Sequence, residues 1–331
     1  MESTKNSPKE FFLHLLAIIA LYMSAASLLT LLFQYINVLF PDPLAYASYD
    51  GIAGAIRYAM ASLMIVFPVY IFISRMLYRE YLAEPEKREY RFRKWLVYFT
   101  LFAAGITIII DLIVLIYNFL GGDLSSRFIL KILVVLLIAV VVFWYYRKDL
   151  KNALSVKQVR VLSYGVSAFV LLAIIFGFFT AGSPLKARLY NFDERKVSDL
   201  TNIQYQIINY WQRKEVLPAA LSDLTDSISG FTAPVDPQSK MAYEYRITNA
   251  PLPSEYKNLS FASKIQPVYE SFELCAEFNL PSNFGLIGRS VNTYPAGAVN
   301  DNWDHAAGRV CFERTIDPAL YPKINNVAPA K

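Results

Sequence analysis

The sequence predicts an α-helical membrane bundle of five transmembrane helices, followed by an α+β domain outside the membrane. Three observations lead to this prediction. The 331 residues are 55% hydrophobic and only 18% charged, whereas soluble domains contain about 25% charged residues. The apolar residues gather into five long runs before residue 182. Both cysteines, Cys275 and Cys311, follow the last run.

Each apolar run is long enough to cross a bilayer as a helix, which takes about 20 residues. The first run exceeds the apolar core of a signal peptide, about 7–15 residues, so it is expected to be a retained span. The predicted spans cover residues 11–40, 52–74, 95–120, 128–146 and 161–181. Residues 1–160 are therefore expected to form a four-helix transmembrane domain with basic links.

The basic residues predict the orientation of the spans. Residues 1–160 contain 17 Lys and Arg against 11 Asp and Glu, and residues 161–331 contain 15 against 16. The links 75–94 and 146–160 carry seven and five basic residues, whereas the opposite side has only Arg127 and Lys131. Because short basic loops remain in the cytoplasm, the N-terminus and both links are predicted to be cytoplasmic. The expected location is the bacterial cytoplasmic membrane, with the C-terminal domain extracytoplasmic.

Three charged residues lie inside the predicted spans: Arg57, Asp111 and Lys131. Charges in the hydrocarbon region are costly and are often functional. One interpretation is a functional cluster. The other is a structural ion pair, or cations that extend to the outer headgroups. The estimated depths overlap, so Asp111 is expected to face the bundle interior and to pair with Arg57, Lys131 or both. Without a partner, its carboxylate would take up a proton.

The fifth span is expected to continue into a soluble helix, so that residues 161–215 form one long element. Gly182, Ser183 and Pro184 interrupt it, and proline suits the first position of a helix. Residues 193–194 offer a second possible start. The amphipathic stretch has apolar residues at helical spacing: Val197, Leu200, Ile203, Ile207 and Trp211.

Residues 216–331 are predicted to form the extracytoplasmic α+β domain. A short helix at Leu221 and Leu224 precedes strands over residues 243–247, 269–278 and 309–316, which are rich in β-forming residues. Residues 317–331 are expected to be a mobile tail. Two cysteines on an oxidising side predict one disulfide, Cys275–Cys311. The alternative is two unrelated free thiols.

The order of features after residue 161 resembles the body of type II secretion pseudopilins and type IV pilins. The resemblance covers residues 161–278: a membrane helix running into a soluble helix, Leu217-Pro218, Val235-Asp236-Pro237 and Tyr243-Glu244-Tyr245. It implies a long helix packed on a small antiparallel sheet. Pilins begin with a cleaved leader and a glutamate in the membrane helix. Here four spans precede that helix, and it has no glutamate, so the resemblance implies the fold rather than a pilus.

The membrane half, with its basic hinge at residues 75–94 and its paired spans, resembles an uncharacterised bacterial four-helix membrane domain family. Because the function of that family is unknown, the resemblance implies no activity. The combination of both halves is similar to uncharacterised envelope proteins of bacterial candidate phyla.

Motifs for catalysis are absent from the sequence. It has no phosphate-binding loop, no G-x-G-x-x-G, no H-E-x-x-H and no C-x-x-C. The two histidines, His14 and His305, are predicted to lie on opposite sides of the membrane and cannot share a site. Asp301 and Asp304 offer a weak alternative cation site. We therefore expect no catalytic residue, no metal and no cofactor, and an enzymatic activity is not indicated.

Two classes of function remain. The first is a structural or interaction protein that displays the pilin-like module to a partner in the envelope. The second is a transporter or a signal-coupling membrane domain that uses Arg57, Asp111 and Lys131. The expected partners are the lipid bilayer and possible envelope proteins, with no nucleic acid, because the basic residues lie between apolar spans. The sequence sets no oligomeric state.

Overall fold

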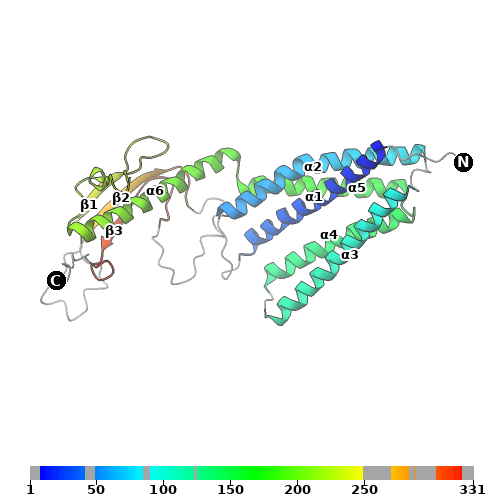
Figure 1. The fold of residues 1–331 in the computed structure, drawn as a ribbon, viewed down its shortest axis with the longest axis horizontal. Coiled ribbons are helices and arrows are strands. Elements are labelled where there is room, and N and C mark those ends of the chain that lie inside the picture. The colour runs from blue at the N-terminus through cyan, green and yellow to red at the C-terminus, as the bar shows by residue number, and fades with distance from the viewer. Residues whose placement is uncertain are drawn as a thin grey trace. The chain divides into compact units, whose positions relative to one another are not determined.

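The computed structural model shows a mostly helical chain with one small three-stranded antiparallel sheet (Figure 1). It divides into two compact units, residues 1–183 with 285–298 and residues 184–284 with 299–331. The structure describes residues 8–41, 49–84, 90–122, 125–248, 270–282, 287 and 303–322.

Five helices of the first unit are long and apolar enough to cross a membrane, which confirms the five predicted runs. Their ends extend beyond the apolar segments; α2, for example, continues through residues 75–83 because Arg, Met, Leu and Glu there are good helix formers. The helices are α1 (Pro8–Leu39), α2 (Tyr49–Ala83), α3 (Arg91–Leu120), α4 (Ser126–Leu150) and α5 (Val156–Ala181).

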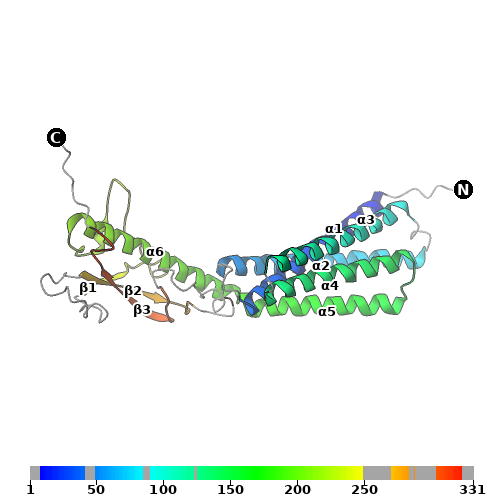
Figure 2. The ribbon, with the colours of Figure 1, turned by 90° about the horizontal axis from the view of Figure 1, so that it is seen from below.

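The five helices pack as a group of three and a pair (Figures 1 and 2). Helix α2 lies along α1 and α5, and α3 lies along α4, while α1 also contacts α3 and α4. Helix α5 is held closely: a Cβ atom on Gly177 would collide with the Met60 sulfur, and the Tyr35 hydroxyl donates a hydrogen bond of 2.6 Å to the Ala173 carbonyl oxygen. By its contacts α5 belongs to the first unit.

The predicted long rod consists of two helices, α5 and α6 (Pro184–Lys214). Helix α5 is followed by its cap residue Gly182, whose φ of 74° lies in the left-handed region that favours glycine. Helix α6 then begins with Pro184 in its first position. The alternative start at residues 193–194 is wrong, because Asp193 lies inside α6 and its carboxylate binds elsewhere.

The second unit packs α6 on the sheet. The sheet has the order β1-β2-β3, with both pairs antiparallel, and Figure 2 shows α6 along one of its faces. After α6 come the 3₁₀ helix η2 (Leu221–Leu224), β1 (Glu244–Thr248), β2 (Glu270–Phe278) and β3 (Gly308–Ile316). These strands confirm the three predicted ones within one residue at each end.

The core of the second unit lies between α6 and one face of the sheet. Leu200, Ile203 and Ile207 are fully buried on α6, and Phe272 and Leu274 are fully buried on β2. Phe272, Leu274, Ala276 and Phe278 alternate along β2 and face the helix. Burial of each such side chain stabilises the unit by about 1.5–3 kcal/mol.

Candidate functional site

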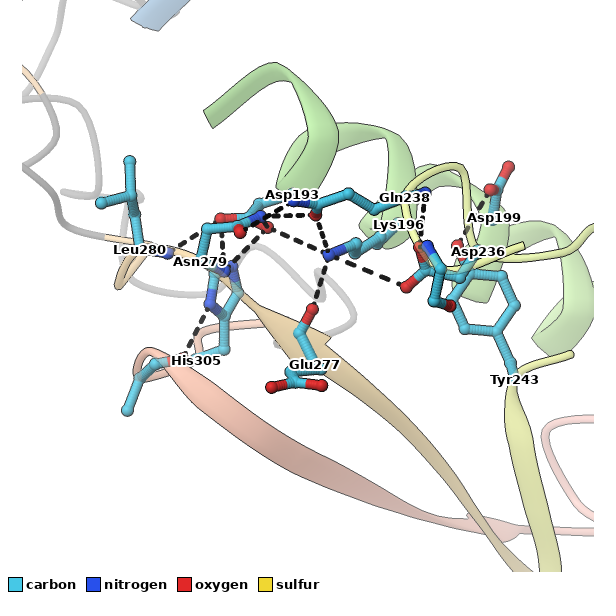
Figure 3. Close-up of polar contacts among 12 residues, drawn as sticks. Asp193, Lys196, Asp199, Asp236, Gln238, Tyr243, Glu277, Asn279, Leu280 and His305 are labelled. Carbon is cyan, nitrogen blue, oxygen red and sulfur yellow. Dashed lines mark hydrogen bonds and ion pairs between the residues drawn. The ribbon is translucent and has the colours of Figure 1, made fainter. Parts of the chain in front are cut away.

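Lys196 is the centre of a buried polar cluster in the second unit (Figure 3). Its side chain is only 3% exposed. The Nζ atom donates hydrogen bonds to the Glu277 carbonyl oxygen at 2.6 Å and to Gln238 Oε1 at 2.9 Å. It also forms ion pairs with Asp193 at 3.5 Å and Asp236 at 3.7 Å. The ammonium group thereby joins α6, the turn before β1 and the end of β2.

Asp193 holds the chain where it leaves β2. Its carboxylate accepts hydrogen bonds from the backbone N–H groups of Asn279 and Leu280 at 2.9–3.0 Å. It also accepts one from the Asn279 amide nitrogen at 2.7 Å. Asp236 similarly accepts the N–H groups of Gln238 and Ser239 and closes its turn. A buried charge is tolerated when it is paired and hydrogen-bonded, so we call Lys196, Asp193, Asp236, Gln238 and Asn279 the Lys196 clamp.

Asp199 lies one turn along α6 from the clamp. Its carboxylate accepts a hydrogen bond of 3.0 Å from the Tyr243 hydroxyl and forms an ion pair of 3.3 Å with Arg195. Burial raises the pKa of Asp199, while the hydrogen bond from Tyr243 lowers it by a smaller amount. The hydrogen bond between Tyr243 and Asp199 connects the residue before β1 to α6. The Asp199 carboxylate therefore has a structural role.

His305 does not face a nucleophile among the residues that the structure describes. Its ring stacks on Phe278, with centroids 3.6 Å apart, and its Nδ1 atom lies 3.2 Å from the Ala306 carbonyl oxygen. Ser282 contacts the backbone of His305 rather than its ring. Burial lowers the pKa of His305. The arrangement is that of a packed loop residue near β3. Asp301, the other half of the alternative cation site with Asp304, lies outside the described residues.

Cys275 and Cys311 are directly opposite each other on β2 and β3. Their Cα atoms are 4.0 Å apart, and the structure joins their sulfur atoms in a disulfide across the sheet. Glu273 brings a carboxylate near both sulfur atoms. Sulfur atoms in a disulfide lack the thiolate charge that a metal ligand needs. Of these three residues, only Glu273 could therefore provide a ligand to a metal.

The first unit has a polar network at the end that carries the basic links. His14 on α1 and Tyr81 on α2 form a hydrogen bond of 2.5 Å between Nε2 and the hydroxyl. The guanidinium of Arg93 on α3 lies 5.0 Å from the centre of the Tyr81 ring and forms an ion pair of 2.5 Å with Asp149 on α4. Polar groups on α1, α2, α3 and α4 are therefore linked to one another at this end.

The three charges predicted inside the spans are placed differently. Asp111 is 6% exposed and faces the interior, as expected. Its Oδ2 atom has no hydrogen-bond partner, and the predicted ion pair with Arg57 or Lys131 is not formed. Lys131 turns toward α1, where its Nζ atom lies 5.7 Å from the centre of the Phe33 ring.

Arg57 is separated from Asp111 by the way the helices pack. It lies on α2, which packs on α1 and α5, whereas Asp111 belongs to the α3–α4 pair. One of its guanidinium nitrogens, Nη2, is buried without a hydrogen-bond partner. Of the two predicted partners, Lys131 is the one on a helix that packs directly along α3, because it lies on α4.

The Lys196 clamp was not found from the sequence. Lys196 lies on the expected polar face of an amphipathic helix, and its partners Asp236, Gln238 and Glu277 are 40, 42 and 81 residues away. One of those partners is a backbone carbonyl, which has no signature in the sequence. Among the features of the sequence, Val235-Asp236-Pro237 includes the clamp residue Asp236.

Comparisons with known proteins find a match for part of the first unit. No curated protein and no solved structure is significantly similar to the chain, and no pilin-like domain is found. A match to one family model agrees with the predicted resemblance to an uncharacterised family. Because the function of that family is unknown, the match implies no activity. Residues 10–146, which include α2, α3 and most of α1 and α4, match the family described as Domain of unknown function (DUF5671).

Proposed function

We propose that the chain is an integral membrane protein of the bacterial envelope that displays a rigid pilin-like module and binds an envelope protein through it. One observation carries this proposal. The second unit has a closed core between α6 and three strands, and the Lys196 clamp fixes the turn before β1 and the end of β2 to the same helix. This unit begins two residues after a helix of membrane-spanning length.

The proposed orientation places the N-terminus and the basic links in the cytoplasm. Exposed cations gather at one end of the apolar helices: Arg75, Arg79, Arg147, Lys151, Lys157 and Arg160. Trp95 and Trp144 lie near the same helix ends and are exposed, as tryptophans at a membrane interface are. With five spans, the second unit is then extracytoplasmic, where a disulfide persists.

The pilin-like interpretation rests on the arrangement of α6 and the sheet. One 31-residue helix packs on a three-stranded antiparallel sheet, as the resemblance to pseudopilins implies. In this proposal the module is an interaction domain held on a bundle of five helices, rather than a pilus subunit.

The test is site-specific photocrosslinking in intact cells. The turn between Asp226 and Phe231 presents Ile228, which is 97% exposed. Asp226, at the start of this turn, lines a hollow together with Tyr210, Arg213 and Asp223. A photoreactive amino acid at Ile228 is expected to form a discrete product with an extracytoplasmic protein. The same residue at Lys151, on the proposed cytoplasmic side, is the control and is expected to form none. Identical product patterns at both positions, or none at Ile228, would refute the proposal.

One observation favours a second candidate, a transporter or signal-coupling domain. Asp111 is buried within the first unit and has a carboxylate oxygen without a partner. In a membrane such a residue is by default a functional candidate. We infer that, if the first unit has an activity of its own, Asp111 is the residue to examine.

A further inference from the structure

The surroundings of Asp111 differ from those of every neighbour on the same helix turn. Ile109, Ile110, Leu112 and Ile113 are between 42% and 59% exposed and would face lipid in the proposed membrane. Asp111 is 6% exposed and turns toward the inside of the first unit. The helix therefore presents one carboxyl group to the interior at a level where its other side chains contact hydrocarbon.

The register of the helices brings Lys131 to the same level as Asp111. The Arg93–Asp149 ion pair joins α3 and α4 near one end. Asp111 follows Arg93 by eighteen residues, and Lys131 precedes Asp149 by eighteen residues. At about 1.5 Å per residue, both lie about 27 Å along the antiparallel pair from that ion pair.

Helix α1 confirms this level independently. Tyr22 on α1 contacts Thr100 on α3 through a hydrogen bond of 3.4 Å. Eleven residues further along each helix are Phe33 and Asp111. Lys131 lies over the ring of Phe33, so the carboxyl group, the aromatic ring and the ammonium group share one level of the unit.

The ionisable groups that face this level are few. On α4, which packs along α3, they are Lys131 and Arg127. Arg127 is engaged by Asn37, with 2.8 Å between Nε and Oδ1. On α1 the structure places no charged side chain between His14 and Leu39, and the Tyr35 hydroxyl is bonded to Ala173. Among the described residues of α1, α3 and α4, Lys131 is thus the one cation at this level that can neutralise a carboxylate on α3.

We propose that Asp111 is a reversible proton-binding site within the membrane and that Lys131 is the cation to which its deprotonated form pairs. A carboxylate that is buried away from water and unpaired is strongly disfavoured. In this proposal the arrangement with Oδ2 unpartnered and Lys131 turned to Phe33 corresponds to the protonated state. Loss of the proton leaves a carboxylate that attracts the ammonium group across the α3–α4 contact, so proton occupancy and the packing of the two helices are coupled.

The proposal deepens the second candidate function and does not depend on a partner of the second unit. If Ile228 forms no crosslink but Asp111 binds a proton, the interaction proposal fails alone. If the crosslink forms and Asp111 binds no proton, the proton-site proposal fails alone.

The test uses the full chain in native membranes and the lipid-soluble reagent dicyclohexylcarbodiimide. A protonated carboxyl group gives its proton to one nitrogen of the reagent, and the carboxyl oxygen adds to the central carbon. The adduct rearranges to a stable acylurea without loss of atoms, so the peptide gains the mass of one reagent molecule. Mass spectrometry of the α3 peptide is expected to show the label on Asp111. The rate is expected to fall as the pH rises, by up to about tenfold per pH unit.

Matched variants test the role of each group. Asp111→Asn is expected to abolish the label. If this variant does not fold, the position of the label in the wild-type protein still decides the question. Asp149, paired with Arg93, is the internal control and is expected to stay unlabelled. Lys131→Met is expected to extend labelling of Asp111 to higher pH, because the carboxylate loses the cation that stabilises its charged form. Arg127→Met on the same helix is the control and is expected to leave the pH dependence of labelling unchanged.

Three results would overturn the proposal. The first is no label on Asp111 at any pH between 5 and 10. The second is a labelling rate that does not change with pH, which would mean that the proton does not exchange. The third is a profile for Lys131→Met that matches Arg127→Met, which would remove Lys131 from the site.

Discussion

Replacing Lys196 with methionine is expected to lower the free energy of unfolding of the second unit by about 3–5 kcal/mol, the usual effect of removing one partner of a buried ion pair. Methionine keeps the length of the side chain but removes the ammonium group. Asp193 and Asp236 would then remain buried without their cation, and the Glu277 carbonyl oxygen would lose its donor. Hydrogen exchange of the full chain in mild detergent, read on the β2 and α6 peptides, measures the loss.

The matched control is Lys214→Met at the end of the same helix. Lys214 is exposed, and its Nζ atom lies 4.4 Å from the centre of the Tyr210 ring, so this variant is expected to cost less than about 1 kcal/mol. Adding Asp236→Asn to Lys196→Met is expected to recover part of the loss, because it removes one uncompensated charge. Equal losses for Lys196→Met and Lys214→Met would contradict the structural role of the clamp.

Breaking the disulfide is expected to destabilise the second unit by about 3–4 kcal/mol in the chain-entropy model, given a loop closed over a separation of 36 residues. The double variant Cys275→Ser, Cys311→Ser removes the covalent bond and leaves a polar cross-strand pair at the same register. Reduced wild-type protein is the matched control and is expected to lose the same free energy. Denaturant unfolding of the full chain, followed by exchange at β2 and β3, measures both.

The bond itself is tested by mass spectrometry without reductant. The expected result is one crosslinked peptide that joins the segments containing Cys275 and Cys311. If both thiols in the native protein are freely alkylated, the prediction of a disulfide is wrong, and the alternative of two free thiols holds.

The sequence predicts the elements of this fold well because each has a periodic signature of its own. Long apolar runs mark α1 to α5, and alternation marks β2, where Phe272 and Leu274 face α6. Helix ends are predicted less well, since polar helix formers continue α2 to Ala83 after the apolar run stops. The start of α6 was ambiguous because Asp193 resembles a helix cap, whereas its carboxylate binds the backbone of Asn279 and Leu280.

Long-range pairing is what the sequence does not reveal. The depths of Arg57, Asp111 and Lys131 along their helices were compatible with ion pairs, but depth says nothing about which helices are adjacent. Arg57 lies on α2, which packs mainly on α1 and α5, whereas Asp111 lies on α3, which packs mainly on α4. Likewise, Lys196 obtains its partners from a turn and a strand end that only the folded sheet brings to α6.

The most direct test of the central claim, a five-span protein with its second unit outside, is cysteine labelling in intact cells. Single cysteines replace Lys151, in the link between α4 and α5, and Ser198, on the exposed side of α6. The background retains Cys275 and Cys311, because the structure contains no free cysteine that would react, and the parent chain is the control. A membrane-impermeant maleimide is expected to label position 198 in intact cells and position 151 only after the cells are opened. Labelling of position 151 in intact cells, or protection of position 198, would contradict the account.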